Sequence, residues 1–584
     1  MLIHRLYRVV PRRLRRRVLS LLPPARQLWL ARRLFRLPDG AARTGVAPAS
    51  VRAGGRRVRV RVSRDATPQS VREHNLDIVV RALDNAGVGY LCLPRPGLRS
   101  AVAVPVEDQP RVRRLLDEDP GLRQACVQRL AAGQPPRGRR RDSGPDAHLM
   151  FRVWEPVASE SGSWMLGDGY ACDVEFWQRV DDRLQGPRPG HPYGVVPRDD
   201  EITVAPAWVF NPHLPDWTSA PPRPTAASLA RTPVEHVSFP IDAVYTWVDG
   251  SDPHWQHRKA AAVASLTGAP LIEEADRASR FASRDELRYS LRSLACFAPW
   301  IRHIYLMTDD QVPPWLDPDH PMVTVVTHRD LFGDTGRLPT FNSHAIETRL
   351  HRIPDLAEHF LYLNDDVFLG RSLPPSTFFL ANGLARFFPS PASIDALPSS
   401  LRDAPVNAAA KNNRQALMDM FGRSFTHKMR HVPHALRRSV LAEIEACLPE
   451  AVQATASHQF RHPHDLSMVS SLHHYWSFLA GTSVPGRIRY AYGDIGDRTT
   501  PIKLAQMLAT RPYDVFCLND VGAYDDATGE QQRMLAEFLP AYLPFRAPFE
   551  LSDDETARRA QLSATELMSV PTESRRHRGR VDVR

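Results

Sequence analysis

Long apolar runs and closely spaced cysteines are missing from this 584-residue sequence. No apolar run reaches the roughly 18 residues that a bilayer-spanning helix needs, so no transmembrane helix is predicted. The apolar stretch nearest the basic N-terminus, residues 18–22, is too short for the core of a signal peptide. The six cysteines form no C-x-x-C pair, which argues against a disulfide framework or a zinc cluster and favours a reducing cytosol.

Acidic residues are almost missing from the first 50 positions, where Asp39 stands against twelve arginines. The resulting charge of +11 accounts for the +10 of the whole chain, so the remainder is near neutral. Nucleic-acid binding needs cations clustered on a folded face, so this distribution argues against it. Residues 1–37 fit either a basic amphipathic helix on an anionic membrane or a solvated arm. We expect a cytoplasmic protein, at the inner face of the cytoplasmic membrane if that helix forms.

The chain is too long for one ordinary core, so two or three domains are expected. Composition divides it as follows: a basic arm (1–50), a small accessory α/β domain (51–184), a Pro-rich linker or surface wrap (185–239), a dense α/β block (240–545) and a polar tail (546–584).

One apolar segment of the dense block ends abruptly in acidic residues. Residues 360–363 are expected to form a buried strand, and Asn364, Asp365 and Asp366 follow it directly. Two adjacent carboxylates at the end of a buried strand are electrostatically costly, and a divalent metal or an arginine usually compensates them. Taken alone, the pattern also fits a solvated acidic turn.

Two further predicted strands end in the same way. Residues 244–248 lead into Asp249 and Asp252, and residues 304–307 lead into Asp309 and Asp310. Predicted helices alternate with these strands, which indicates a Rossmann-like or GT-A-like, mainly parallel sheet flanked by helices. Because parallel strands end at one edge, the acids should form an anionic site for a divalent cation and a diphosphate.

Several motifs in this block resemble the conserved regions of the Stealth family, the sugar-phosphate transferases of microbial capsule synthesis. They occur in family order. The matching segments are residues 241–253, Asp285–Ser293, Pro339–Ser343, Leu363–Asp366, His431–His434, Phe460–Asp465 and Cys517–Asp520. The resemblance makes 240–545 the catalytic domain. It implies transfer of a sugar-1-phosphate from a nucleotide diphosphate sugar, with a UDP-linked hexosamine expected, to a glycan or glycolipid hydroxyl.

The resemblance also implies a set of site residues, with Mg²⁺ or Mn²⁺ at Asp365 and Asp366. The catalytic residues expected are Asp365, Asp366, His431, Arg461 and Asp520. The substrate-binding residues expected are Trp247, Asp249, Asp252, Arg284, Asn342, Ser343, Glu347, His434 and Asn519. Arg461 suits a bidentate phosphate clamp. His431 is the expected base and Asp366 its rival, and this choice stays open.

Three alternatives accompany this interpretation. A metal-dependent glycosyltransferase could use Asn364-Asp365-Asp366 as its metal motif. His431 and His434 could chelate zinc from one helix face, although Pro433 between them instead predicts a helix that starts there. Arg288 and Arg292 lie four apart on a predicted helix and are expected to be solvated at the surface.

Overall fold

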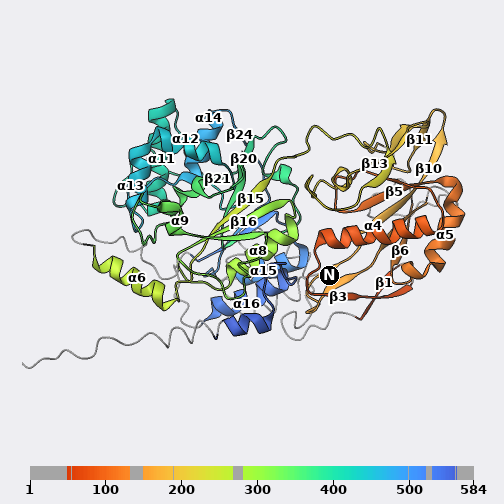
Figure 1. Ribbon diagram of the computed structural model, residues 1–584, viewed down its shortest axis with the longest axis horizontal. Coiled ribbons are helices and arrows are strands. Elements are labelled where there is room, and N and C mark those ends of the chain that lie inside the picture. Colours follow the sequence, from red (N-terminus) through yellow and green to blue (C-terminus); the bar gives the residue numbers. More distant parts are fainter. Residues whose placement is uncertain are drawn as a thin grey trace, which may run out of the picture.

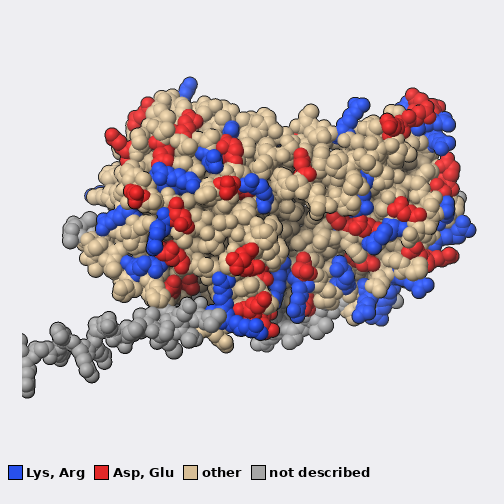
Figure 2. All heavy atoms as spheres, in the orientation of Figure 1, with Lys and Arg blue, Asp and Glu red and all other residues tan. Residues whose placement is uncertain are grey.

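The computed structural model describes residues 49–53, 56–131, 149–188, 190–266, 281–497, 499–520, 529–559 and 561. The predicted membrane-binding segment 1–37 and most of the polar tail lie outside these residues. Within them, no helix combines the length and the apolar character needed to cross a bilayer. The described chain forms two lobes, an N-terminal one in red to yellow and a C-terminal one in green to blue (Figure 1). Basic and acidic side chains are interspersed over both lobes on the face shown in Figure 2.

The N-terminal lobe is built on a seven-stranded sheet in which β10 pairs with β5, β7 and β11. Six of the nine residues of β10 are buried, and helix α4 packs over β5 and β10. The lobe contains β1 (Ser50–Ala53), β2 (Arg56–Arg59), β3 (Arg61–Ser63), α4 (Pro68–Asn85), β4 (Leu91–Cys92), β5 (Ser100–Pro105), η1 (Val106–Asp108), α5 (Gln109–Glu118), η2 (Pro120–Leu122), β6 (Cys126–Ala131), β7 (Leu149–Trp154), β8 (Val157–Ser159), β9 (Met165–Leu166), η3 (Asp168–Tyr170) and β10 (Cys172–Val180).

The segment expected to be a linker, 185–239, differs from that expectation. It holds the end of β11 (Arg183–Gln185) together with β12 (Val195–Pro197), β13 (Ile202–Ala205), η4 (Ala207–Phe210) and β14 (Arg223–Ala226). Val209 and Phe210 are buried in the core of the N-terminal lobe. Pro197 closes a strand and Pro206 precedes η4, so these prolines occupy positions where a missing N–H does no harm.

The C-terminal lobe contains a five-stranded sheet in the order β17-β16-β15-β18-β23. Its strands are β15 (Ile241–Thr246), β16 (Ile301–Thr308), β17 (Val323–Thr327), β18 (His359–Asn364) and β23 (His434–Arg437). The first four are mutually parallel, and β23 joins β18 antiparallel. The predicted α/β fold with a mainly parallel sheet is therefore confirmed.

The strand order places a topological switch point at the carboxyl edge of this sheet. The chain runs from β15 outward through β16 and β17, then returns to β18 on the other side of β15. Strand order therefore reverses between β16 and β18, on the two sides of β15, and ligands of open α/β sheets bind at such a switch point. The loops after β15 and β18 flank it.

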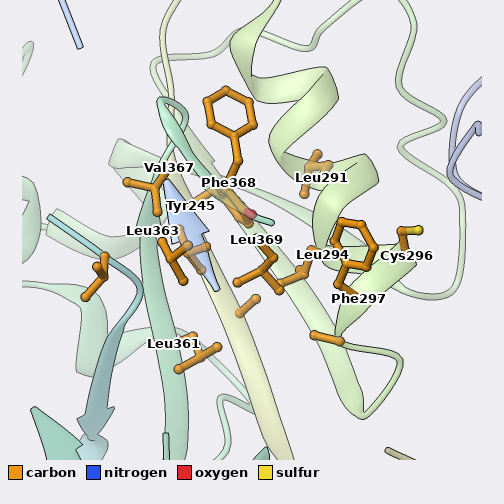
Figure 3. Packing of buried hydrophobic residues seen from close by; sticks show 14 of the residues in the cluster. Tyr245, Leu291, Leu294, Cys296, Phe297, Leu361, Leu363, Val367, Phe368 and Leu369 are labelled. Carbon is orange, nitrogen blue, oxygen red and sulfur yellow. The ribbon is translucent and has the colours of Figure 1, made fainter. Parts of the chain in front are cut away.

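A small second sheet extends this edge. Strand β19 (Val367–Leu369) pairs antiparallel with β26 (Val515–Asn519), which pairs in parallel with β25 (Tyr490–Asp494). Helix α8 (Glu286–Phe297) covers the junction, because Leu287, Leu291 and Leu294 recur at helical spacing on one buried face. Figure 3 shows this face packed against side chains of β15, β18 and β19.

The remaining elements surround the sheets. They are α6 (Pro253–Ala264), α9 (His328–Phe332), α10 (Ser343–Glu347), η6 (Leu350–Arg352), η7 (Pro375–Thr377), β20 (Ala385–Phe387), β21 (Pro389–Ser393), α11 (Pro405–Phe421), β22 (His427–Met429), α12 (Arg438–Cys447), α13 (Pro449–Ser457), η8 (Met468–Leu472), α14 (His473–Leu479), β24 (Ser483–Pro485), α15 (Thr500–Thr510) and α16 (Glu530–Tyr542).

The prediction of a helix that starts at Pro433 is wrong. Pro433 directly precedes strand β23, whose His434 lies opposite Tyr362 of β18. Long-range pairing with β18 outweighs the local preference of proline for the first turn of a helix.

The prediction that Arg288 and Arg292 are solvated at the surface is also wrong. Both guanidinium groups bind the carboxylate of Glu550, at 2.8 and 2.6 Å, and that carboxylate is fully buried. Residues 546–551, expected to open the polar tail, are therefore anchored to α8, with Phe549 in the core beside them.

The two lobes meet at Trp164. Its indole packs against Phe297 of α8 and Phe545, and the Arg511 guanidinium lies 3.9 Å from its ring centre. Arg511 also lies over the ring of Tyr542, so it stacks on both aromatic side chains.

Candidate active site

Three carboxylates interact electrostatically where β18 ends and α8 begins. Asp365 and Asp366 lie between β18 and β19, and Glu286 occupies the first turn of α8. Burial raises the pKa of Asp365 well above its usual range, and the carboxylates of Glu286 and Asp366 add to this effect. Burial likewise raises the pKa of Glu286. The sequence analysis missed Glu286 as a site residue, although it stands inside the Asp285–Ser293 motif.

Asp366 and His431 form a hydrogen-bonded ion pair, with 3.1 Å between Asp366 Oδ1 and His431 Nε2. Burial alone would raise the pKa of Asp366, but the imidazolium of His431 outweighs it and the pKa ends below its usual value. In the same way the Asp366 carboxylate overcomes burial and raises the pKa of His431. Asp366 and His431, the two candidate bases, therefore titrate as one coupled pair.

A second donor holds the other side of Asp366. The Cys517 thiol lies 3.2 Å from Asp366 Oδ2, because β26 pairs with β19 and places Cys517 opposite Val367. Burial and the Asp366 carboxylate raise the pKa of Cys517 far above its usual value, so its thiol stays protonated and donates.

Arg461 lies beside the start of α10. Its guanidinium donates to Ser343 Oγ at 3.0 Å, and it also lowers the pKa of the buried Glu347. Burial nevertheless dominates and raises the pKa of Glu347 to about 7. The charge of Glu347 in turn acts on His431, so these residues adjoin the Asp366–His431 pair.

Arg284 and Asp520 form a second ion pair, at 2.7 Å, which joins the loop before α8 to the end of β26. Arg284 also contacts Glu286, so this pair adjoins the three carboxylates. Asn519 is the last residue of β26 and lies opposite Asp494 of β25. Asp520 and Asn519 thus reach the site from a segment far along the chain.

The loop after β15 is organised around Gln311. The Gln311 side chain accepts from the N–H of Asp249 and donates to Asp252, while Asp252 caps α6. Gly250 donates its N–H to the Phe281 carbonyl at 2.8 Å, so close that a Cβ would lie 2.4 Å from that oxygen. The buried Trp247 indole N–H finds no acceptor among the described residues.

The acids that end β16 are occupied elsewhere. Asp309 binds the Arg258 guanidinium at 2.9 Å, and Asp310 binds Arg329 at 3.3 Å. The parallel strand ends share one edge as expected, but these two carboxylates are neutralised by arginines and do not join the cluster around Asp366.

Asn342 and His434, both expected to bind substrate, form hydrogen bonds inside the protein. Asn342 is fully buried, caps α10, and donates to Asp465 at 2.8 Å. His434 is buried and hydrogen-bonded to His474 at 2.9 Å. Both side chains are engaged inside the protein. Asp465, which also binds His344 and His458, fixes the loop that carries Arg461.

The donor set suits a hard divalent cation. Glu286, Asp365 and Asp366 offer carboxylate oxygens, the ligands that Mg²⁺ and Mn²⁺ prefer. The raised pKa of Asp365, caused by burial and by its two acidic neighbours, marks a repulsion that a cation would relieve. Together with Arg284 and Arg461, the cluster offers cations for a diphosphate and a proton-sharing pair for a hydroxyl.

The chain matches one known protein family in four regions. The conserved regions CR1, CR2, CR3 and CR4 of Stealth proteins match residues 239–267, 280–387, 430–478 and 506–561. An exopolysaccharide phosphotransferase of Streptomyces coelicolor is 42% identical over 561 residues, which is 94% of each chain. The exopolysaccharide phosphotransferase CpsY of Mycobacterium tuberculosis is 32% identical over 85% of this chain and 92% of its own. The solved galactosyltransferase LgtC, 11% identical, covers 52% of this chain and 96% of its own with a TM-score of 0.27, too low to support an argument.

Proposed function

Because this chain belongs to the Stealth family of phosphotransferases, we propose that it transfers a sugar-1-phosphate from a nucleotide diphosphate sugar to a hydroxyl of an acceptor glycan or glycolipid. The donor is a UDP-linked hexosamine. The acceptor oxygen bonds to the β-phosphorus, the bond from that phosphorus to the bridging oxygen breaks, and a nucleoside monophosphate leaves. The product is a phosphodiester in a capsule or other cell-surface polysaccharide.

The arrangement of Arg461 beside Glu347 and the Asp366–His431 pair carries this proposal. Its guanidinium is held by Ser343 beside Glu347 and close to the Asp366–His431 pair. A planar guanidinium donates two parallel hydrogen bonds to a phosphoryl group, where charge develops during in-line transfer. Arg284, fixed by Asp520, supplies a second cation near the same carboxylates.

The Asp366–His431 pair takes the proton of the acceptor hydroxyl. Asp366 holds the imidazole through Nε2, and Cys517 holds Asp366 from its other oxygen. Because the Nε2–H donates to Asp366 across the 3.1 Å contact, the acceptor proton goes to Nδ1 of His431 and leaves an imidazolium that Asp366 stabilises.

Mg²⁺ or Mn²⁺ would be held by Glu286, Asp365 and Asp366. When bound, the ion neutralises charge on the diphosphate. Removal of divalent ions with a chelator should abolish turnover, and restored activity on adding Mg²⁺ or Mn²⁺, measured as nucleoside monophosphate release, checks the assignment.

The rival function is that of a metal-dependent glycosyltransferase, in which Asn364-Asp365-Asp366 would bind the metal. The two reactions break different bonds, so a donor labelled at the β-phosphorus separates them. Label in the glycan product, with release of a nucleoside monophosphate, supports phosphotransfer. Label retained in a released nucleoside diphosphate would eliminate it.

The basic segment 1–37 holds the enzyme at the inner face of the cytoplasmic membrane. Its arginine clusters interleaved with apolar residues suit an anionic lipid surface. The full chain should pellet with vesicles that contain anionic lipid and remain in solution with neutral ones. A Δ1–37 variant that still pellets would refute the assignment.

A further inference from the structure

The thiol beside the catalytic carboxylate belongs to a three-residue cluster with mixed donor chemistry. Asp366, His431 and Cys517 place one ligand atom each within 4.8 Å of the others. Asp366 stands in the middle, 3.1 Å from the imidazole nitrogen and 3.2 Å from the sulfur. The pairing of β19 with β26 fixes the sulfur there, and β18 fixes the carboxylate.

The cluster is close to the size of a small tetrahedral metal site. Zinc binds sulfur at about 2.3 Å and nitrogen or oxygen at about 2.0–2.2 Å, so neighbouring ligands in a tetrahedron lie roughly 3.3–3.7 Å apart. The imidazole nitrogen lies 3.1 Å from one oxygen of Asp366 and the sulfur 3.2 Å from the other, and one ligand atom of each residue lies within 4.8 Å of the others. Binding one ion with all three residues therefore needs an adjustment of their side chains.

The cluster shares Asp366 with the carboxylate site for Mg²⁺, but its other two ligands differ in chemistry from carboxylates. Thiolate and imidazole favour Zn²⁺ and Cd²⁺, whereas Mg²⁺ takes oxygen ligands almost exclusively. Entry comes from the side of His431 and Asp366, because their side chains are 32% and 17% exposed. The fully buried sulfur lies behind them and is reached across Asp366.

We propose that Asp366, His431 and Cys517 form an inhibitory site for a thiophilic divalent ion such as Zn²⁺. On binding, the sulfur forms a metal–thiolate bond and its proton leaves to solvent, while the imidazole lone pair and the carboxylate become ligands. The loss of activity rests on the proposed function, since it follows from removing His431 and Asp366 from proton transfer. Binding of the ion does not depend on that function.

Cd²⁺ serves as the probe, because its thiolate complexes absorb in the ultraviolet. The full-length Cys447→Ser protein, which lacks the one exposed cysteine, should bind one equivalent of Cd²⁺ with this absorption, and Zn²⁺ should displace it. Adding Cys517→Ser should remove the absorption and weaken binding at least about tenfold. X-ray absorption of the Zn²⁺-loaded Cys447→Ser protein gives a second readout that does not require Cys517 to be altered. A zinc shell without sulfur would overturn the site.

Inhibition is measured separately, in the presence of excess Mg²⁺. Zn²⁺ should suppress nucleoside monophosphate release by Cys447→Ser, and Cys517→Ser should be at least about tenfold less sensitive relative to its own uninhibited rate. Cd²⁺ binding through Cys517 without loss of turnover would overturn the inhibitory role. Cd²⁺ binding in a protein that proves to transfer no sugar phosphate would leave the site standing and remove the proposed function instead.

Discussion

At the residue scale, the centre of the site is the Asp366 carboxylate with a different donor on each oxygen. His431 binds one oxygen and Cys517 the other. The arrangement fixes the carboxylate rotamer without a direct contact to arginine. The Arg461 guanidinium is therefore not engaged by Asp366, whereas Arg284 is paired with Asp520. A catalytic group held this way requires little rearrangement when substrate arrives.

Loss of any one of three groups should greatly slow the reaction. Asp366→Asn, His431→Ala and Arg461→Ala should each reduce turnover at least about a hundredfold, because each removes proton transfer or charge stabilisation. Steady-state kinetics with saturating donor checks this, and Arg329→Ala, at an exposed ion pair, is the matched control. A near-normal rate in one variant removes that residue from the mechanism.

The activity should fall on the acid side at a pH above the ordinary histidine value. The Asp366 carboxylate raises the pKa of His431 above 6.5, and a base must be neutral, so kcat/KM should decline as pH falls through this raised pKa. Asp366→Asn removes the cause of the increase, so the residual activity should decline at lower pH. An acid limb that stays in place in Asp366→Asn assigns it to another group.

At the element scale, the loop after β15 depends on a close approach that only glycine permits. In Gly250→Ala the new Cβ would lie 2.4 Å from the Phe281 carbonyl, so the loop must move. We expect a loss of about 1–3 kcal/mol of stability and a higher donor KM. Urea unfolding and donor titration test this against Gly169→Ala, where a Cβ meets open space. Equal behaviour of the two variants would exclude a special role for the loop.

The anchoring of residue 550 to α8 should be a large contributor to stability. Glu550→Gln leaves Arg288 and Arg292 without their buried carboxylate, which should cost about 3–5 kcal/mol. Urea unfolding at neutral pH measures this, with Glu537→Gln, exposed on α16, as the control.

The lowered pKa of Glu550 predicts a pH dependence of stability. Burial opposes ionisation, but the bond to Arg292 outweighs it and lowers the pKa of Glu550 below its unfolded value. Its contribution is therefore present above about pH 4.3 and is lost as pH falls through the lower folded pKa. The difference in the free energy of unfolding between wild type and Glu550→Gln should shrink in that acid range. A difference that does not change with pH would contradict the ion pair.

Strands with local signals could be predicted from the sequence, while features set by distant partners could not. Residues 323–327 are all valine or threonine, which favour strands, and they form β17 as expected. The strand at His434 exists because it pairs with β18. Arg288 is half-buried because it binds Glu550, a residue 262 positions further along the chain. Local pattern contains neither partner, so a helix and a solvated surface were expected there.

The candidate site divides in the same way. Because the predicted parallel strands end in acidic residues, the sequence predicts Asp365 and Asp366 at one edge of the sheet. Glu286 and Cys517 lie in segments that resemble the family, but neither was a predicted site residue, because one begins an ordinary amphipathic helix and the other sits in a buried strand. Only the meeting of β19, β26 and α8 gives them their neighbours.

At the scale of the whole molecule, the lobes are joined by aromatic contacts of Trp164, and the Arg511 guanidinium stacks on its ring. Trp164→Ala removes contacts to Phe297, Phe545 and the Arg511 guanidinium, and should cost about 3 kcal/mol. Urea unfolding measures this, and Trp217→Ala, a 45% exposed indole of the N-terminal lobe, should cost far less. A Trp164→Ala protein as stable as Trp217→Ala would show that the lobes hold together by other contacts.

The pairing of β19 with β26 also has a consequence for the growing chain on the ribosome. Asp366 and Cys517 are separated by 151 residues, so at about 5–20 residues per second the carboxylate is made roughly 8–30 s before the thiol that holds it. Asp520 and the Glu550 anchor follow later still. The carboxylates of Glu286, Asp365 and Asp366 are therefore made before the last segments that organise the site. A nascent chain that stalls before β26 holds the acids of the site without the groups that organise them, so it carries no working phosphotransferase centre.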